Sequence, residues 1–252
     1  MTRRRFFASP QTFDFAGERA TLTADEARHL RDVLRLQAGD EVYVFDGTGR
    51  EFCCAVSLIK RDLAVLTIRN EVEPTRPESP LNLTLAVALL KGEKFDLVVQ
   101  KITELGACGV VPVITRFADI RLRDESDANK RVARWQRIAI EAAKQSGRAA
   151  VPQISTPILL ESLLTDPANS ETLRLMFAER SGESFGKVPQ TLSAPGRVIA
   201  LVGSEGGWSD EEIQEARSAG WHIVTLGGRT LRAETAAITV AGLLQHRYGD
   251  LK

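Results

Sequence analysis

The sequence predicts an α/β protein with a small N-terminal β-barrel and a larger C-terminal domain built on a mostly parallel sheet. Short strand-like runs fill the N-terminal part, whereas strand-like and helix-like segments alternate in the C-terminal part. Between the two parts, Pro74, Pro77 and Pro80 interrupt both helix and sheet pairing. We therefore expect two domains, at residues 1–73 and 74–252.

The N-terminal part is expected to contain one helix and several short strands. Thr23 and Glu26 have the spacing of a capping box, and they introduce an apolar stripe made of Ala27, Leu30, Val33 and Leu34. Strands are expected at residues 42–45, 52–59 and 63–68. A small β-barrel with one helix accounts for this pattern, and such barrels often bind oligonucleotides.

The C-terminal part alternates between strands and helices. Strands are expected at residues 83–89, 110–114, 173–178, 198–202 and 222–226. Helices are expected at residues 95–105 and 131–146, and from about residues 210 and 233 onward. Such alternation predicts a mostly parallel sheet that is covered by helices on both faces.

Composition excludes some classes of function. The chain has 252 residues and a formal net charge of zero, which argues against a non-specific basic coat for nucleic acid but leaves room for a local basic face. The three cysteines, Cys53, Cys54 and Cys108, have no histidine at metal-ligand spacing, so no metal site is expected. No segment approaches the roughly 20 apolar residues of a membrane span. We expect a cytoplasmic protein without a membrane partner.

Two glycine-rich loops follow predicted strands, where open parallel sheets bind their ligands. The first loop covers residues 203–209, and Ser209 with Glu212 forms a capping box for the next helix. The second loop covers residues 227–232 and leads into another helix. Neither loop has the spacing of a dinucleotide fingerprint or of a P-loop, which disfavours a nicotinamide dehydrogenase. The residues alone therefore predict a ligand-binding α/β enzyme.

Both loops resemble signatures of the 16S rRNA (uracil-N3) methyltransferases. Gly-Ser-Glu-Gly-Gly-Trp-Ser at 203–209 is similar to the family's Gly-Pro-Glu-Gly-Gly-Phe-Ser loop, and Leu-Gly-Gly-Arg-Thr-Leu-Arg-Ala-Glu-Thr-Ala at 226–236 is similar to its Leu-Gly-x-Arg-Ile-Leu-Arg-x-Glu-Thr-Ala signature. Supporting segments lie at residues 29–35 with 39–40, at residues 101–106, and at residues 134–135 with 142–148. Ser204 departs from the usual proline, which should loosen the first loop slightly, and Thr230 departs from an aliphatic residue.

The resemblance implies much that the residues do not show by themselves. It implies a C-terminal domain of the SPOUT class with a deep trefoil knot, and an N-terminal PUA-like RNA-binding domain. It also implies S-adenosyl-L-methionine as cofactor, 16S rRNA of the small ribosomal subunit as substrate, and a homodimer. The cofactor residues that it implies are Phe177, Ala178, Leu201, Val202, Gly203, Gly207, Leu226, Gly227 and Leu231.

Methylation at N3 of uracil requires removal of a proton from a poor nucleophile. The site must therefore supply a base, or a cation that stabilises the uracil anion. Arg232 is the first candidate for the cation. Glu234 is a candidate base, although a glutamate in the first turn of a helix also favours the helix dipole. Glu205 is a third catalytic candidate that could instead hold its glycine loop.

A basic stretch suggests an RNA-binding surface. Residues 116–150 contain nine basic and five acidic side chains, although many helix faces are basic only because they are solvated. The arginines expected to contact RNA are Arg3, Arg4, Arg5, Arg31, Arg35, Arg134, Arg148 and Arg229. Two other functions stay open: a SPOUT enzyme that methylates a ribose 2′-oxygen, and a non-catalytic RNA-binding factor in ribosome assembly.

Overall fold

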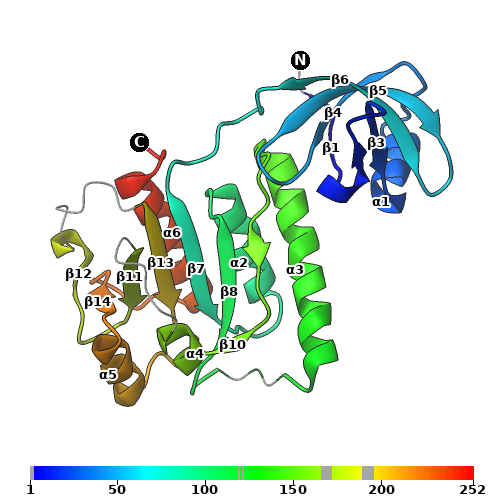
Figure 1. Ribbon diagram of the computed structural model, residues 1–252. Helices are drawn as coiled ribbons and strands as arrows, with labels where there is room; N and C mark the ends of the chain where they lie inside the picture. The colour runs from blue at the N-terminus through cyan, green and yellow to red at the C-terminus, as the bar shows by residue number, and fades with distance from the viewer. Residues whose placement is uncertain (1–2, 119, 121, 166–171, 189–195) are drawn as a thin grey trace. The chain divides into compact units, whose positions relative to one another are not determined.

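Figure 1 shows the computed structural model of the chain, which describes residues 3–118, 120, 122–165, 172–188 and 196–252. The chain divides into two units. The first unit comprises Met1–Glu78 and Ile140–Val151, and the second comprises Ser79–Ala139 and Pro152–Lys252.

The first unit is built on a curled, six-stranded sheet (Figure 1). Its strands, in spatial order, are β1 (Arg5–Phe7), β4 (Glu41–Phe45), β5 (Glu51–Ile59), β6 (Ala64–Val72), β3 (Arg19–Leu22) and β2 (Phe13–Asp14). The three strands expected from the sequence are confirmed as β4, β5 and β6. β1, β2 and β3 were not predicted, because two to four residues are too few to show an alternating pattern. The inward-facing side chains, among them Phe6, Leu22 and Val44, form the core.

The helix of this unit departs from its expected form. α1 (Ala24–Arg28) is followed by a π-helical turn, His29–Val33. The predicted capping box is wrong: Thr23 makes no side-chain cap, and the Glu26 carboxylate instead accepts hydrogen bonds from Lys144 Nζ at 2.8 and 3.0 Å. The wider π turn also rotates the end of the predicted stripe away from the core, so that Val33 is exposed.

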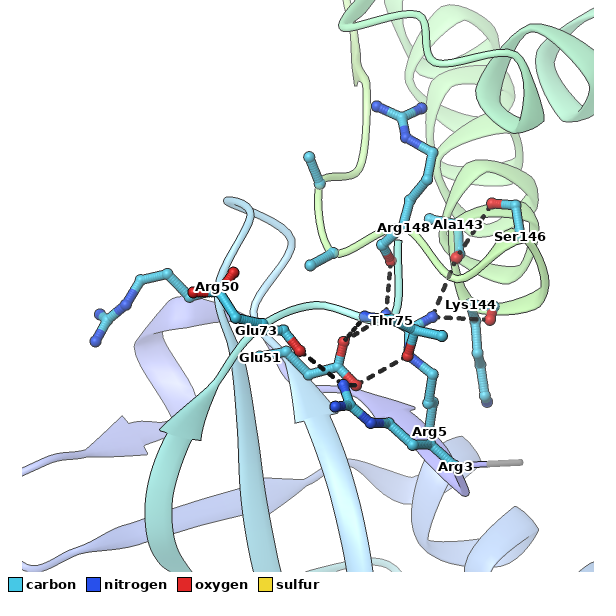
Figure 2. A network of polar contacts seen from close by, with 12 residues as sticks. Arg3, Arg5, Arg50, Glu51, Glu73, Thr75, Ala143, Lys144, Ser146 and Arg148 are labelled. Atoms are coloured by element: carbon cyan, nitrogen blue, oxygen red, sulfur yellow. Dashed lines mark hydrogen bonds and ion pairs between the residues drawn. The ribbon is translucent and has the colours of Figure 1, made fainter. Parts of the chain in front are cut away.

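A buried ionic network joins β1 and β5 to the C-terminal end of α3 (Glu125–Ser146), as Figure 2 shows. Arg5 donates to Glu51 through Nε at 3.1 Å and through Nη2 at 3.0 Å. Its guanidinium also donates to the carbonyl oxygens of Lys144 at 2.9 Å and of Arg148 at 2.8 Å. Helix C-termini leave carbonyl groups without helical partners, and Arg5 satisfies them here.

The second unit contains a sheet in which every neighbouring pair of strands within the described residues is parallel, as predicted. Its spatial order is β10 (Ile158–Leu159), β8 (Gly109–Ile114), β7 (Asn82–Ala88), β13 (Arg197–Val202), β11 (Thr172–Phe177), β14 (His222–Thr225) and β12 (Glu183–Ser184), and β9 (Gln153–Ile154) also pairs with β8. The five expected strands are confirmed as β7, β8, β11, β13 and β14. The very short β9, β10 and β12 were not predicted.

Helices cover both faces of this sheet. They are α2 (Lys94–Glu104), α4 (Leu160–Thr165), α5 (Asp210–Ser218) and α6 (Ala233–Tyr248), and Trp135 in the first part of α3 packs against Phe95 of α2. α4 and α5 pack with Ile199 and Leu201 of β13 in one hydrophobic cluster. Side chains alternate along a strand, so Val198 and Ala200 point to the opposite face, where α6 packs against β7, β13 and α2. α4 was not predicted.

The long helix α3 begins at Glu125, earlier than the expected residue 131. The Oδ1 atom of Asp124 accepts a hydrogen bond from the Asp127 backbone at 2.8 Å, and acidic residues in the first turn favour the helix dipole. The apolar stripe that indicates the helix begins only after these polar residues.

Two predictions about organisation stay predictions. The trefoil knot is a matter of how the chain is threaded, which the strand order does not specify. The domain boundary between residues 73 and 74 also stays a prediction. The first compact unit extends to Glu78 and includes a second segment, Ile140–Val151. Across the described part of the chain, no helix combines the length and the apolar character that a bilayer crossing requires.

Candidate active site

A pocket lies in the second unit at the carboxyl ends of three neighbouring strands. Phe177 of β11 is paired with Val202 of β13 and with Val224 of β14, so these strands end at the same level and their loops meet. The pocket is lined by Phe177, Ala178, Glu179, Val202, Gly203, Ser204, Gly207, Trp208, Thr225, Leu226, Gly227, Gly228, Arg229, Thr230, Leu231, Ala233 and Ala236. Both glycine-rich loops therefore contribute to one cavity.

The first loop, residues 203–209, is fixed at both ends. The predicted capping box is confirmed: Ser209 Oγ accepts from the Glu212 backbone at 3.2 Å, and the Glu212 carboxylate accepts from the Ser209 backbone at 2.9 Å. The buried Trp208 indole donates to the Phe177 carbonyl at 2.8 Å. A Cβ atom on Gly203 would lie 3.0 Å from the indole ring, so this position leaves little space for a side chain.

Ser204 holds the loop, in contrast to the loosening that we expected. Its hydroxyl donates to the Phe117 carbonyl at 3.1 Å, and its own carbonyl accepts from the Gly207 backbone at 3.0 Å. A proline at this position has no hydroxyl to make the first contact. A Cβ atom on Gly206 would lie 2.6 Å from the Cβ of Phe117, which gives this glycine a steric role.

The second loop exposes its backbone to the pocket. Gly227 and Gly228 both have φ of 71°, a conformation that L side chains rarely adopt. The Gly227 backbone donates to Thr225 Oγ1 at 3.2 Å, which anchors the loop to the end of β14. Thr230 is exposed and lines the pocket, so its departure from an aliphatic residue removes no buried packing contact.

Eight of the nine residues expected to bind cofactor line this pocket. The ninth, Leu201, is fully buried in the core of the sheet. Glu179 was missed because it lies just beyond its strand and belongs to neither glycine loop. Apart from Arg229, the other lining residues that were not among the expected cofactor contacts are Ser204, Trp208, Thr225, Gly228, Thr230, Ala233 and Ala236. Arg229, expected to contact RNA, also lines the pocket.

The three catalytic candidates lie beside the pocket. Glu205 and Glu234 follow the lining residues Ser204 and Ala233 in the chain, and Arg232 is the exposed N-cap residue of α6. Lys94 was not predicted from the sequence. Its Nζ lies 2.7 Å from Oε1 of Glu205 and 3.9 Å from Oε2 of Glu234.

The ion pair between Lys94 and Glu205 affects the protonation of both side chains. Burial alone would raise the pKa of Glu205, but the hydrogen bond from Lys94, a backbone hydrogen bond and the charges of Lys94 and Lys91 together outweigh it, and the pKa is lowered. The hydrogen bond to Glu205 raises the pKa of Lys94. Lys94 is therefore an ammonium group and Glu205 a carboxylate at neutral pH.

Two arginines expected to bind RNA are buried in the first unit. Arg5 belongs to the network of Figure 2, and Arg148 pairs with Glu78 through Nε at 2.9 Å and Nη2 at 2.7 Å. We do not retain either as an RNA contact, because a buried and paired guanidinium would have to leave its partner to reach a phosphate.

The other expected RNA contacts are at least partly accessible. Arg4 and Arg35 are exposed. Arg3 donates to the Glu73 carbonyl at 2.8 Å, and Arg31 donates to Asp32 at 2.6 and 2.8 Å. Arg134 pairs with Asp96 of α2 but keeps 55% of its side chain exposed. Arg121 and Asp119, counted in the basic stretch, lie outside the described residues.

The described residues contain no group of three or more histidine, cysteine, aspartate or glutamate side chains that could hold a metal ion. What the pocket offers is backbone from two glycine loops, apolar side chains and a few charged groups at its edge. Together with the parallel sheet, these features define an α/β enzyme that binds an organic cofactor at the carboxyl ends of its strands.

Comparison with known families identifies which enzyme class this is. A family model for the RNA methyltransferase domain matches residues 77–245, and a model for the RNA methyltransferase PUA domain matches residues 22–69. The chain belongs to this family of RNA methyltransferases. The PUA-like identity of the N-terminal sheet agrees with the expectation from the sequence.

Related proteins carry names of the same kind. Ribosomal RNA small subunit methyltransferase E of Synechocystis is 35% identical over 217 residues, which are 86% of this chain and 69% of the relative. The enzyme of the same name from Bacillus subtilis is 28% identical over 231 residues, which are 90% of this chain and 90% of the relative.

Solved structures are similar over the full length of the chain. The Neisseria gonorrhoeae ribosomal RNA small subunit methyltransferase E, crystallised with S-adenosylmethionine, has a TM-score of 0.87 and 34% identity, with all of both chains covered. A Legionella pneumophila methyltransferase in complex with the same cofactor has a TM-score of 0.88 and 31% identity, also with full coverage.

Proposed function

We propose that this protein transfers a methyl group from S-adenosylmethionine to N3 of a uridine in the 16S rRNA of the small ribosomal subunit. One observation carries the proposal: the two loops that resemble this family's signatures, at residues 203–209 and 226–232, line a single pocket. Relatives named small subunit rRNA methyltransferases support the substrate, and neighbours crystallised with S-adenosylmethionine support the cofactor.

The residues of the pocket fit this cofactor. Phe177, Leu226 and Leu231 provide apolar surface for an adenine ring, and the glycine loops provide backbone groups for its polar edge. Glu179 offers an acceptor for hydroxyl or ammonium groups, and Arg229 offers a cation for a carboxylate. When bound, S-adenosylmethionine supplies an electrophilic methyl group and keeps the electron pair of the broken carbon–sulfur bond on sulfur.

The side chains beside the pocket suit the uracil half of the reaction. N3 becomes nucleophilic when its proton leaves, and the resulting negative charge is shared with the uracil oxygens. Arg232 provides a cation at the N-terminus of α6 for this charge, and Glu205 and Glu234 provide carboxylates. The PUA-like unit and the exposed arginines Arg4, Arg35 and Arg134 provide surface for the RNA backbone.

The proposal includes a homodimer that acts in the cytoplasm, where small ribosomal subunits are found. α6 buries Ala237, Val240 and Leu244, while Ala236 and Leu243 are only partly covered. The partly covered residues leave apolar surface beside the pocket, which suits an interface related by twofold symmetry.

Methyl transfer with purified components tests the proposed reaction. The protein is incubated with S-adenosylmethionine carrying a labelled methyl group and with small ribosomal subunits or their free 16S rRNA. The RNA is then digested to nucleosides for mass spectrometry. Labelled 3-methyluridine is expected, with or without a metal chelator. Label in a 2′-O-methyl nucleoside would support the ribose methyltransferase instead, and absence of label from both substrates would contradict the enzyme assignment.

A further inference from the structure

Lys94 connects three segments that are far apart in the sequence. It is the first residue of α2, Glu205 lies in the loop after β13, and Glu234 lies in the first turn of α6. The Nζ atom of Lys94 is at hydrogen-bond distance from Glu205 and at ion-pair distance from Glu234. The lysine thus links a carboxylate of the first glycine loop to a carboxylate of the first turn of α6.

The two carboxylates differ in what they have left to offer. Glu205 keeps a third of its side chain exposed and accepts a hydrogen bond from Lys94 at 2.7 Å. Glu234 is only 13% exposed, and its Oε2 atom is buried without a hydrogen-bond partner among the described residues. A buried carboxylate oxygen without a donor is costly, so the Glu234 carboxylate keeps unused capacity to accept a hydrogen bond or a proton.

We infer that Lys94 is a positioning residue that holds Glu205 and leaves Glu234 as the acceptor for the N3 proton of uracil. This inference rests on the proposed function. The proton moves from N3 to the accessible part of the Glu234 carboxylate, and the electron pair of the N–H bond stays on N3. That pair then forms the bond to the transferred methyl group, so that Glu234 is protonated when transfer is complete.

The protonation states agree with this division of roles. Hydrogen bonding raises the pKa of Lys94, so a neutral amine is not at hand to act as the base. The lowered pKa of Glu205 makes that carboxylate a poor acceptor for the N3 proton. Two further cations affect these pKa values. The charge of Lys91 helps to lower the pKa of Glu205, and the charge of Arg232 acts against the rise in the pKa of Lys94.

The test compares single-turnover methylation rates at saturating RNA and cofactor across a range of pH. Lys94→Met should lower the rate at neutral pH by about 10-fold or more and move the acidic limb of the profile to higher pH, because Nζ of Lys94 lies 3.9 Å from Glu234. The sign follows because loss of a neighbouring cation raises the pKa of a carboxylate. Lys94→Arg should restore most of the rate, and Glu234→Gln should lower it by about 100-fold or more.

Lys101→Met is the matched control. Lys101 lies on the same helix, pairs with Glu104 at 2.9 Å and is not a lining residue of the pocket. Its replacement should leave both the rate and the pH profile unchanged. Binding of S-adenosylhomocysteine, measured by calorimetry, should be unchanged in all four variants, which shows that they are folded.

The outcomes separate the inference from the proposed function. A wild-type protein that makes no 3-methyluridine contradicts the proposed function, and the inference falls with it. An active wild type whose Lys94→Met variant keeps its rate, or loses rate equally at every pH, overturns the inference alone. If Lys94→Met no longer binds S-adenosylhomocysteine, Glu234→Gln decides: a variant that is folded and retains the acidic limb overturns the role of Glu234.

Discussion

Arg232 is the side chain that the proposed mechanism requires for the developing uracil anion. It is exposed at the N-terminus of α6 and is not among the residues that line the cofactor pocket. Arg232→Ala should therefore lower the single-turnover rate by roughly 100-fold, the effect of losing one preorganised donor to an oxyanion. Calorimetry should show unchanged affinity for S-adenosylhomocysteine. A variant with the full saturated rate would exclude this role for Arg232.

Arg134 is expected to behave differently, because it lies away from the pocket on α3. Its guanidinium pairs with Asp96, and more than half of its side chain remains exposed. Arg134→Ala should weaken RNA binding, reduce the dependence of log affinity on log salt by about one unit, and leave the saturated rate unchanged. Filter binding at several salt concentrations measures the slope. An unchanged slope would mean that Arg134 serves only to hold Asp96.

Individual roles could be predicted from the sequence where the partners are close in the chain. The Ser209–Glu212 capping box is one such case, since both partners lie within one helical turn. Lys94 could not be found in this way, because its partners lie 111 residues or more further along the chain. Thr23 and Glu26 show the converse: their spacing fits a local cap, but Glu26 is bound by a lysine 118 residues away.

The network around Glu51 connects β1 and β5 to the end of α3 (Figure 2). The side chains of Arg5 and Glu51 are 6% and 0% exposed. Glu51→Ala should therefore lower the free energy of unfolding of the first unit by about 3–5 kcal/mol, because it leaves a buried guanidinium without its counter-charge. Urea unfolding measures the change in free energy, and amide hydrogen exchange in β1 and β5 shows whether these strands lose protection.

Glu71→Ala provides the control for this prediction. Glu71 pairs with Arg50 at 2.7 Å on the same sheet, but both side chains are about half exposed. Loss of such a surface pair should cost less than about 1 kcal/mol. Equal losses in the two variants would contradict the structural role assigned to the buried network.

Strands and helices with a clear hydrophobic pattern were predicted from the sequence, and those without such a pattern were not. β7 and β13 are runs of apolar residues in a sheet buried on both faces, and the sequence shows them directly. β9, β10 and β12 have two residues each, and only their pairing with β8 or β14 makes them strands. The π turn at His29–Val33 was also missed, because its apolar residues fit an ordinary helical stripe.

The arrangement of the chain was predictable in class but not in detail. Alternating strands and helices indicated the parallel sheet, and the register of Phe177 with Val202 and Val224 explains why loops distant in sequence line one pocket. That residues 140–151 join the N-terminal unit depends on contacts such as Arg5 with the Arg148 carbonyl. No local sequence pattern contains information about such long-range contacts. The knot that the resemblance implies likewise has no local sequence pattern from which it could be predicted.

Assembly is tested by molar mass in solution. The apolar residues of α6 that stay partly covered, Ala236 and Leu243, should be buried in an isologous dimer. Light scattering at micromolar concentration should give twice the 27.7 kDa of one chain. Leu243→Glu should shift the mass toward the monomer and lower activity, because it places a charge in the interface. A monomeric wild type with full activity would contradict the proposed dimer.

The most direct test of the proposed function is nucleoside mass spectrometry of 16S rRNA from cells that lack the gene. The small-subunit RNA of the deletion strain should lose 3-methyluridine, and a plasmid copy of the wild-type gene should restore it. The Arg232→Ala variant should restore it poorly at equal protein levels, since the chemical step is impaired. If 3-methyluridine persists in the deletion strain, or if a 2′-O-methyl nucleoside disappears in its place, this protein is not the uracil-N3 methyltransferase of the small subunit.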